Sequence, residues 1–274
     1  MKKIFISYIF LFSMSSTSFP IFGREPIVRA LVYDDSFLGP IGRGTSLESI
    51  KNTLSFFSSI IPNISTITPS ELKNGKLQKG DLFILPGGRD RPYHAELKGD
   101  GNKILDDFVN KGGSILGICA GAYYFGTEVR FNPKNPLFSV NEKRYLSFYP
   151  GAVIGPLFGD KNYDPFTSSG VHAASVLFKG ESTSQKVFYN GGGYFEALAP
   201  LPPHIEVLAI YEENKEAAIV RIQHGEGLVI LSSVHFEYNP DTILIPDKKM
   251  QIVKKELTPY YSELSEKIKN LFLF

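Results

Sequence analysis

Tryptophan is absent from this 274-residue chain, and cysteine occurs only once, at Cys119. A single cysteine excludes an internal disulfide. An excess of one charge is also missing, since 29 basic and 28 acidic residues leave a formal net charge of +1, and this balance gives no support to nucleic-acid binding. Hydrophobic residues make up 43% of the chain and aromatic residues 13%, which argues against a disordered or fibrous protein and is ample for a packed core.

The first 23 residues have the layout of a secretory signal peptide. Lys2 and Lys3 precede an apolar run over residues 4–12, and small residues follow it. A membrane span needs about 20 apolar residues and this run has roughly half as many, so a signal peptide is favoured over an uncleaved anchor. We therefore expect an exported protein whose mature part, residues 24–274, is one domain with no stable membrane span. A lone thiol in such a protein is either buried and inert or kept for chemistry.

The hydrophobic pattern of the first half predicts a doubly wound α/β fold. The strands expected there cover residues 27–33, 64–67, 81–85 and 114–118. The helices expected between and after them cover residues 45–60, 102–111 and 120–125. Thr45 is the expected N-cap of the first helix, with Glu48 completing a capping box. Strands and helices that alternate with short links are typical of a mostly parallel, flavodoxin-like sheet.

The second half is richer in predicted strands. They cover residues 153–154, 174–178, 187–189, 207–211, 217–222 and 228–232. A tight turn over His224–Gly227 joins the last two. Charged and apolar residues alternate at helical spacing over 249–272, which predicts a terminal amphipathic helix. This helix is expected to pack on the domain, and its apolar stripe is also suited to a homodimer.

The segment Gly117–Gly121 directly follows the apolar strand SILGI and has the spacing of a nucleophile elbow, with Cys119 at its centre. Small flanking residues let the chain turn sharply from strand to helix, which presents the thiol at the carboxyl edge of the sheet, where ligands bind in open α/β folds. A helix N-terminus beneath the sulfur favours thiolate over thiol. Taken alone, the motif is equally consistent with a buried, inert cysteine in a packing turn.

A glycine pair at the end of the preceding strand is the first of two features that favour chemistry. In the segment Leu85–Arg89, the consecutive Gly87 and Gly88 leave backbone N–H groups free to point at one spot. Together with the Ala120 N–H, which follows the nucleophile, they can form an oxyanion hole. An ordinary glycine turn explains this segment equally well when it is considered alone.

The second feature is a His-x-Glu motif after the last predicted strand. His235 and Glu237 lie two residues apart, so in extended chain their side chains point the same way. A histidine near the thiol can act as general base and acid, and a carboxylate behind it fixes its tautomer. A single His-x-Glu is more often a surface strand end. The combination of elbow, glycine pair and His-x-Glu favours a catalytic site.

With these segments, the order of elements resembles the class I glutamine amidotransferase superfamily, whose triad is Cys, His and Glu with the last two as His-x-Glu. Within it, the sequence is most similar to the domain found at the N-terminus of eukaryotic-type biotin–protein ligases, which also occurs alone. The match extends from Ile27 to Asn239, and its most specific part is GICAGAYY. The other matching segments are Val32–Asp35, Leu85–Asp90 with Pro92 and Tyr93, Tyr189–Gly193 and Val234–Glu237.

The resemblance implies Cys119 as nucleophile, His235 as base and Glu237 as the residue that orients the histidine. It does not imply biotin ligation, because the ligase proper resides in a separate domain with a Gly-Arg-rich adenylate loop and a Lys-Trp-Pro-Asn-Asp-like motif. This chain has no tryptophan, and Gly42-Arg43-Gly44 resembles part of that loop without its surrounding elements. No cofactor is expected.

Several polar residues near the predicted site have two interpretations. Asp34 and Asp35 end the first strand and either hydrogen-bond the thiol or form a solvated pair. Arg89, Asp90 and Tyr93 follow the predicted oxyanion loop and either line a substrate pocket or belong to the plain surface. The glycines at 191–193 either permit close backbone approach near the site or form a bulge. The remaining histidines lack ligand spacing, which speaks against a metal site; they are His94, His172, His204 and His224.

The function favoured by the sequence is that of a thiol hydrolase or acyl-transfer enzyme acting on an amide or related carbonyl of a small-molecule or peptide substrate. Glutamine-dependent amidotransfer is disfavoured because it needs a synthetase to receive ammonia, and the chain encodes none. The alternatives are a non-catalytic binding or regulatory module that keeps the elbow as a ligand pocket, and a redox-sensing thiol.

Overall fold

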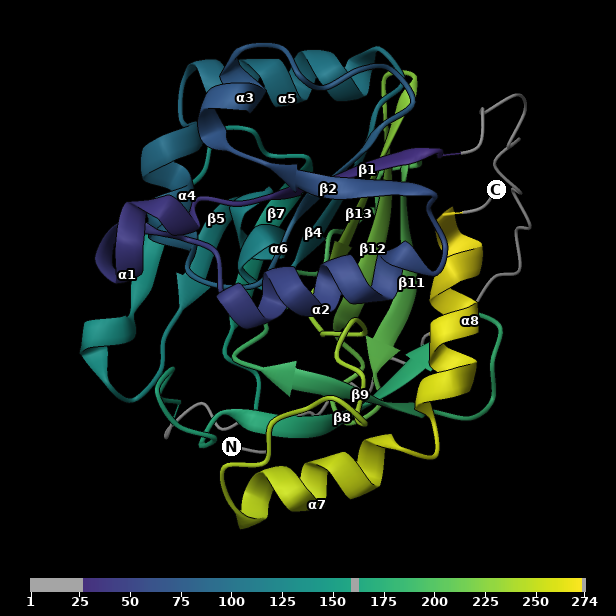
Figure 1. The fold of residues 1–274 in the computed structure, drawn as a ribbon. Helices are drawn as coiled ribbons and strands as arrows, with labels where there is room; N and C mark the ends of the chain where they lie inside the picture. Colours follow the sequence, from purple (N-terminus) through teal and green to yellow (C-terminus); the bar gives the residue numbers. More distant parts are fainter. Residues whose placement is uncertain (1–26, 159–162, 273–274) are drawn as a thin grey trace, which may run out of the picture.

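A single mixed sheet organises the parts of the chain that the computed structural model describes, residues 27–158 and 163–272. Ten of its 13 strands follow one another in the order β2-β1-β3-β4-β13-β12-β10-β7-β5-β6, and β11, β8 and β9 extend it from β12 (Figure 1). The predicted signal peptide lies outside the described residues. Among the helices within those ranges, none combines the length and apolarity that crossing a membrane requires.

Five parallel strands form the centre of the fold. They are β2 (Asn63–Ile67), β1 (Arg29–Tyr33), β3 (Leu82–Leu85), β4 (Ser114–Ile118) and β13 (Gly227–Ser232). Each was predicted as a strand. Alternate residues enter opposite cores: in β1, Ala30 and Val32 pack on one face of the sheet and Leu31 and Tyr33 on the other. A strand buried on both faces needs apolar residues at every position, which explains the continuous apolar runs in the sequence.

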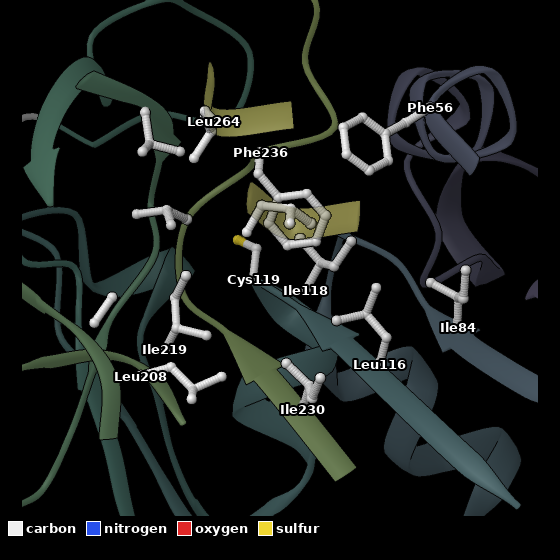
Figure 2. Close-up of a cluster of buried hydrophobic side chains, with 14 of the residues drawn as sticks. Phe56, Ile84, Leu116, Ile118, Cys119, Leu208, Ile219, Ile230, Phe236 and Leu264 are labelled. Atoms are coloured by element: carbon white, nitrogen blue, oxygen red, sulfur yellow. The ribbon is translucent and has the colours of Figure 1, made fainter. Parts of the chain in front are cut away.

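Helices cover both faces of this parallel centre, so the doubly wound α/β prediction is confirmed. On one face, α2 (Leu47–Ser58) and α8 (Tyr261–Phe272) contribute Phe56 and Leu264 to the cluster that Figure 2 shows around Ile118 and Cys119. The helices on the other face are α3 (Pro69–Lys73), α4 (Asp90–Leu97), α5 (Asp100–Asn110) and α6 (Ala120–Tyr124). Of these, α3 and α4 were not predicted.

The β-rich second half is also present. Its strands are β5 (Gly126–Phe131), β6 (Val140–Lys143), β7 (Tyr149–Gly155), β8 (Val171–Phe178), β9 (Gln185–Asn190), β10 (Tyr194–Phe195), β11 (Ile205–Tyr211) and β12 (Ala217–His224). The predicted tight turn closes the antiparallel β12–β13 pair, in which His224 faces Gly227. Strands β5, β6 and β10 were not predicted. Three further short helices are η1 (Ser36–Leu38), α1 (Gly39–Gly42) and η2 (Pro136–Phe138).

Two predicted helix boundaries are wrong. The N-cap of α2 is Ser46, whose side chain accepts from the Ser49 N–H, because the Thr45 hydroxyl is used to donate to Asp35 at 2.5 Å. The predicted helix over 249–272 is two helices, α7 (Lys248–Leu257) and α8, with Pro259 between them. Proline has no N–H to continue a helix and clashes with the preceding turn. The apolar side of α7 packs against β8 and β9 (Figure 1).

Candidate active site

The candidate site lies at the carboxyl ends of three neighbouring parallel strands, β3, β4 and β13. Ile118 at the end of β4 pairs with Ser232 at the end of β13, and Gly117 pairs with Leu85 at the end of β3. Cys119 therefore emerges between two segments: the loop 86–88 after β3 and the segment 233–237 after β13. Sequence positions more than 100 residues apart meet at this edge because parallel strands end on the same side of a sheet.

Cys119 occupies the predicted strand-to-helix turn. It lies between β4 and α6 with φ +50° and ψ −105°, a backbone conformation that non-glycine residues rarely adopt. A Cβ atom at Gly117 would lie 2.8 Å from the Gly121 carbonyl oxygen, and one at Gly121 would lie 2.1 Å from the Leu85 carbonyl oxygen. Both flanking glycines are thus required for the turn to form. Cys119 is buried, and 7% of the residue is exposed.

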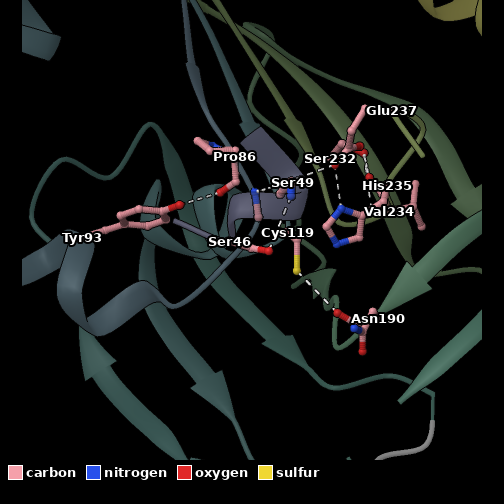
Figure 3. A network of polar contacts seen from close by, with 11 residues as sticks. Ser46, Ser49, Pro86, Tyr93, Cys119, Asn190, Ser232, Val234, His235 and Glu237 are labelled. Carbon is pink, nitrogen blue, oxygen red and sulfur yellow. Dashed lines mark hydrogen bonds and ion pairs between the residues drawn. The ribbon is translucent and has the colours of Figure 1, made fainter. Parts of the chain in front are cut away.

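His235 and Glu237 form a buried pair beside the thiol. His235 Nδ1 lies 2.8 Å from Glu237 Oε1, and the residues are 5% and 1% exposed. Figure 3 shows the imidazole ring between Glu237 and Cys119. The His235 N–H donates to the Phe188 carbonyl oxygen at 2.8 Å, which fixes the backbone that carries the ring. The chain over Phe236 and Glu237 is a turn rather than the extended backbone that the His-x-Glu prediction assumed, and the two side chains still contact each other.

The charges around His235 favour its protonated form. Burial acts to lower the pKa of this imidazole, but the negative charges of Glu237 and Cys119, and hydrogen bonds to both side chains, outweigh it and raise the pKa to about 10. An imidazolium at neutral pH stabilises a neighbouring thiolate by charge attraction in a water-poor environment. The arrangement therefore places a proton donor, the His235 imidazolium, beside the thiol.

The glycine pair after β3 serves two different purposes. The Gly87 N–H donates to Ser49 Oγ at 2.9 Å, so it is not available for the predicted oxyanion hole. A Cβ atom at Gly87 would lie 2.6 Å from His235 Cε1, so this glycine instead gives the imidazole its space. The sequence did not single out Ser49, whose hydroxyl also lies 3.4 Å from Glu237 Oε1, because nothing in the residue type marks it.

Two backbone N–H groups, one in the loop after β3 and one at the start of α6, have no acceptor in the described parts of the chain. Gly88 faces Thr45 in an isolated antiparallel bridge whose hydrogen bonds use neighbouring residues, and no acceptor within residues 27–158 and 163–272 takes the Gly88 N–H. A Cβ atom at Gly88 would lie 2.0 Å from the Gly44 carbonyl oxygen, so only glycine fits. Ala120 is the first residue of α6, and its N–H has no intrahelical partner.

Arg89 and Asp90 hold other parts of the chain rather than lining an open pocket. The Arg89 guanidinium donates to the carbonyl oxygens of Pro40 at 2.8 Å and Ile41 at 3.0 Å. Asp90 forms a two-pronged ion pair with Arg144, and both residues are buried, at 7% and 3% exposed. Burial is the main influence on Asp90 and raises the pKa of its carboxyl, against the effect of Arg144. Neither predicted interpretation, pocket lining or plain surface, fits Asp90.

Tyr93 and the aspartate pair also support loops. Tyr93 is fully buried, and its hydroxyl donates to the Pro86 carbonyl oxygen at 2.9 Å (Figure 3). This hydrogen bond anchors the loop after β3. Asp34 accepts from the Ser36 N–H at 2.9 Å. Asp35 is fully buried and binds the Thr45 N–H at 2.9 Å. The predicted hydrogen bond from this pair to the thiol is not among their contacts; both carboxylates shape the chain before α2.

The third contact of Cys119 is with the segment after β9. The thiol donates to the Asn190 carbonyl oxygen, with Sγ at 3.7 Å (Figure 3). The next three residues, Gly191–Gly193, permit the close approach that the glycine run suggested. Each of their carbonyl oxygens accepts from a buried tyrosine hydroxyl: Tyr123 to Gly191 at 3.3 Å, Tyr189 to Gly192 at 2.5 Å and Tyr211 to Gly193 at 2.8 Å.

In the described parts of the chain, no group of three or more histidine, cysteine, aspartate or glutamate side chains is placed to hold a metal ion.

The sequence is similar to a known protein family and to proteins of two organisms. A family model described as "Biotin-protein ligase, N terminal" matches residues 31–272. A biotin–protein ligase of Schizosaccharomyces pombe (strain 972 / ATCC 24843) is 33% identical over 189 residues, which cover 67% of this chain and 30% of the ligase. An uncharacterized protein of Chlamydia muridarum (strain MoPn / Nigg) is 35% identical over 187 residues, 68% of this chain and 71% of the relative.

The fold is also found among solved structures. The crystal structure of a glutamine amidotransferase superposes with a TM-score of 0.51 at 17% sequence identity and covers 88% of this chain and 99% of that one. At this identity the likeness shows the fold alone.

Proposed function

Because the chain belongs to the biotin–protein ligase N-terminal family and has a class I glutamine amidotransferase-like fold, we propose that it is a cysteine-nucleophile hydrolase or acyl transferase of amides or related carbonyl compounds. The observation that carries this proposal is Cys119 at a strained turn beside the buried His235–Glu237 pair, with Oε1 of the glutamate 2.8 Å from Nδ1. A nucleophile, a base and a carboxylate that orients the base form the kind of triad that carries out covalent acyl transfer.

In the first half of the proposed reaction, Cys119 Sγ attacks the carbonyl carbon and forms a C–S bond. The carbonyl electron pair moves to oxygen, where the Gly88 and Ala120 N–H groups stabilise the negative charge. As the electron pair returns, the C–N bond breaks. The leaving amine takes a proton from the His235 imidazolium, and an acyl-enzyme remains.

In the second half, the now neutral His235 removes a proton from water. The water oxygen attacks the acyl carbon, the C–S bond breaks, and sulfur leaves as the thiolate. The products are a carboxylic acid and an amine, and the imidazolium–thiolate pair is restored. Throughout the cycle, Glu237 keeps the proton-carrying nitrogen of His235 directed at the reacting atoms.

Biotin ligation does not form part of this proposal. The chain spans 30% of the length of the curated ligase that it matches, and the activity of that whole protein is a property of the ligase. The absence of tryptophan and of a complete adenylate loop in the sequence gives no support to ligation here.

Intact-mass spectrometry of the protein with a panel of amide substrates tests the proposed function. Wild type should gain the mass of an acyl group on Cys119 during turnover, and Cys119→Ala should gain none. Product formation without any adduct in wild type, and undiminished in Cys119→Ala, would contradict it. Ligand-induced stabilisation that is equal in both proteins, with no product from either, would instead favour a binding module.

We also propose that the protein is exported. The support is the signal-peptide layout of its first 23 residues, with Lys2 and Lys3 before a short apolar run. N-terminal sequencing of the protein expressed in its own cells should find a mature chain that begins close to Arg24. A chain that retains residues 2–23 in full would contradict this proposal.

A further inference from the structure

We propose that Ser49 is a positioning residue that ties the loop after β3 to the carboxylate of Glu237 and so keeps His235 directed at the thiol. The inference rests on the proposed function and adds to it a residue that acts through another side chain. Ser49 lies in the first turn of α2 and is fully buried. Its hydroxyl contacts a group on each side of the site, the Gly87 N–H at 2.9 Å and Glu237 Oε1 at 3.4 Å.

The direction of both hydrogen bonds of Ser49 is fixed by its partners. A backbone N–H can only donate, so the Ser49 oxygen accepts from Gly87. An ionised carboxylate can only accept, so the Ser49 proton is directed at Glu237. Figure 3 shows Ser49 between Pro86 and His235. The result is a chain of donors that starts in the loop after β3 and ends on the carboxylate, and each bond in such a chain strengthens the next.

Glu237 depends on this contact because it is buried and has few partners. The residue is 1% exposed, and within residues 27–158 and 163–272 two side chains bind its carboxylate, His235 through Nδ1 at 2.8 Å and Ser49. Both contact Oε1, while Oε2 has no partner in the same ranges. A buried carboxylate needs hydrogen bonds in place of those that water would supply. Ser49 therefore helps to set the orientation in which this carboxylate meets the imidazole.

The loop end of this connection is held by the start of α2. The Ser46 N–H donates to the Gly87 carbonyl oxygen at 3.0 Å, while the Gly87 N–H donates to Ser49. One helix turn thus binds both backbone groups of this glycine. A Cβ atom at Gly87 would lie 3.1 Å from Ser49 Oγ and 2.6 Å from His235 Cε1, so the hydroxyl and the imidazole both lie against it. A displacement of Ser49 would therefore affect the loop and the triad together.

The contact with the carboxylate is the longer of the two. Its 3.4 Å exceeds the range of about 2.6–3.2 Å that is typical of catalytic hydrogen bonds, and such bonds often tighten when substrate is bound. Hydrogen bonds to an ionised group are also stronger than neutral ones. We therefore expect Ser49 to influence the reactivity of Cys119 through Glu237 and His235.

Alkylation of Cys119 by iodoacetamide at pH 7 tests this inference without a known substrate. Each rate is divided by the rate of free glutathione under the same conditions. In Ser49→Ala the Gly87 N–H and Glu237 lose the hydroxyl that they share, and alkylation should slow by about tenfold, the worth of one hydrogen bond to a charged group. Ser49→Thr keeps the hydroxyl and should restore most of the wild-type rate.

A double variant shows whether Ser49 acts through Glu237. In the Glu237→Gln background the charge to which Ser49 donates is gone, so the addition of Ser49→Ala should change the rate by no more than about twofold. Thr53→Val is the matched control. Thr53 lies one turn further along α2, is fully buried, and has a hydroxyl without a partner in the described parts of the chain. This variant should react at the wild-type rate.

The possible outcomes are distinct. Slower alkylation of Ser49→Ala that disappears in the Glu237→Gln background, with Thr53→Val unaffected, supports the inference. An unchanged rate in Ser49→Ala, or the same slowing factor in both backgrounds, overturns it and leaves the proposed function standing. Wild-type alkylation no faster than that of glutathione contradicts the activated thiol and overturns both.

Discussion

Cys119 lies between two segments that each follow a parallel strand, and these segments contribute different groups to the site. On the β13 side, His235 and Glu237 bring two titratable side chains to the thiol, 2.8 Å from each other. On the β3 side, the loop 86–88 brings backbone and open space, and the polar side chains that follow it point elsewhere. Arg89 holds the chain near Pro40, and Asp90 binds a distant arginine.

The difference shows which residues at a sheet edge carry chemistry. On the β13 side, His235 lies beside the nucleophile, and although burial lowers the pKa of its imidazole, the charge of Glu237 helps to raise it. The side chains of the β3 side hold a glycine loop in which the Gly88 N–H has no acceptor in the described parts of the chain and the absence of a side chain at Gly87 leaves room for His235. Variants of the β13 side should therefore change thiol reactivity most, and variants of the β3 side should change stability most.

The largest effect on stability is expected from Arg144→Met, which leaves Asp90 buried and unpaired. Removal of one partner from a buried ion pair costs about 3–5 kcal/mol. Chemical denaturation at pH 7 should show a loss of that size, while the folded protein keeps its rate of Cys119 alkylation. Lys73→Met is the control, since its pair with Glu96 is partly exposed and should contribute about 1 kcal/mol or less. Equal losses of unfolding free energy in Arg144→Met and Lys73→Met would contradict a special structural role for the buried pair.

A smaller loss, combined with slower alkylation, is expected from Gly87→Ala. The added methyl group would lie 2.6 Å from His235 Cε1, so it links the two sides by displacing the imidazole. Overpacking of this kind costs about 1–3 kcal/mol. Gly101→Ala is a suitable control because its Cβ would meet no atom closer than 3.3 Å. Alkylation at the wild-type rate in Gly87→Ala would show that the loop does not govern the position of the ring.

The smallest effect is expected from Tyr93→Phe. This variant removes the hydrogen bond to the Pro86 carbonyl oxygen and keeps the buried ring. The loss should be about 0.5–1.5 kcal/mol in the free energy of unfolding, with no change in alkylation. Tyr145→Phe, at a side chain that is 73% exposed, should leave both measurements unchanged. A marked fall in the alkylation rate of Tyr93→Phe would show that Tyr93 affects the reactivity of Cys119 and is not only structural.

The sequence predicts the fold where local pattern decides it. The strand over 114–118 is predicted with its observed bounds, because a fully buried parallel strand requires a continuous apolar run. Helix α4 has no such pattern: it is short and polar and carries Pro92 in its first turn. The observed N-cap of α2 lies one residue after the predicted one, because the Thr45 hydroxyl donates to Asp35. Only tertiary contacts decide features of this kind.

The same limit applies to the site. Cys119, His235 and Glu237 stand out because each follows a predicted strand within a motif of fixed spacing, and such spacings are visible in the sequence. The role of Asp90 depends on Arg144, which lies 54 positions away, and no spacing rule connects the two. Ser49 and Asn190 are ordinary polar residues in the sequence. Their contacts with Gly87 and Cys119 appear only once the sheet has brought the loops together.

The central claim is that the His235–Glu237 pair holds an imidazolium beside Cys119 and so makes its sulfur a better nucleophile. Since the pKa of His235 is raised to about 10, the imidazolium and its support of the thiolate should persist at every pH below that value and weaken as the pH rises through it. In Glu237→Gln the imidazole loses the charge that raises its pKa, so it should lose its proton at lower pH and leave the thiolate without a counter-ion.

The most direct test is the rate of iodoacetamide alkylation of Cys119 between pH 6 and pH 9 in wild type and Glu237→Gln. Wild type should react at a nearly constant rate across this range. In Glu237→Gln the rate should fall by about tenfold per pH unit below pH 8, as for an ordinary thiol. A wild-type rate that falls in parallel with the variant would contradict the claim that the pair activates Cys119.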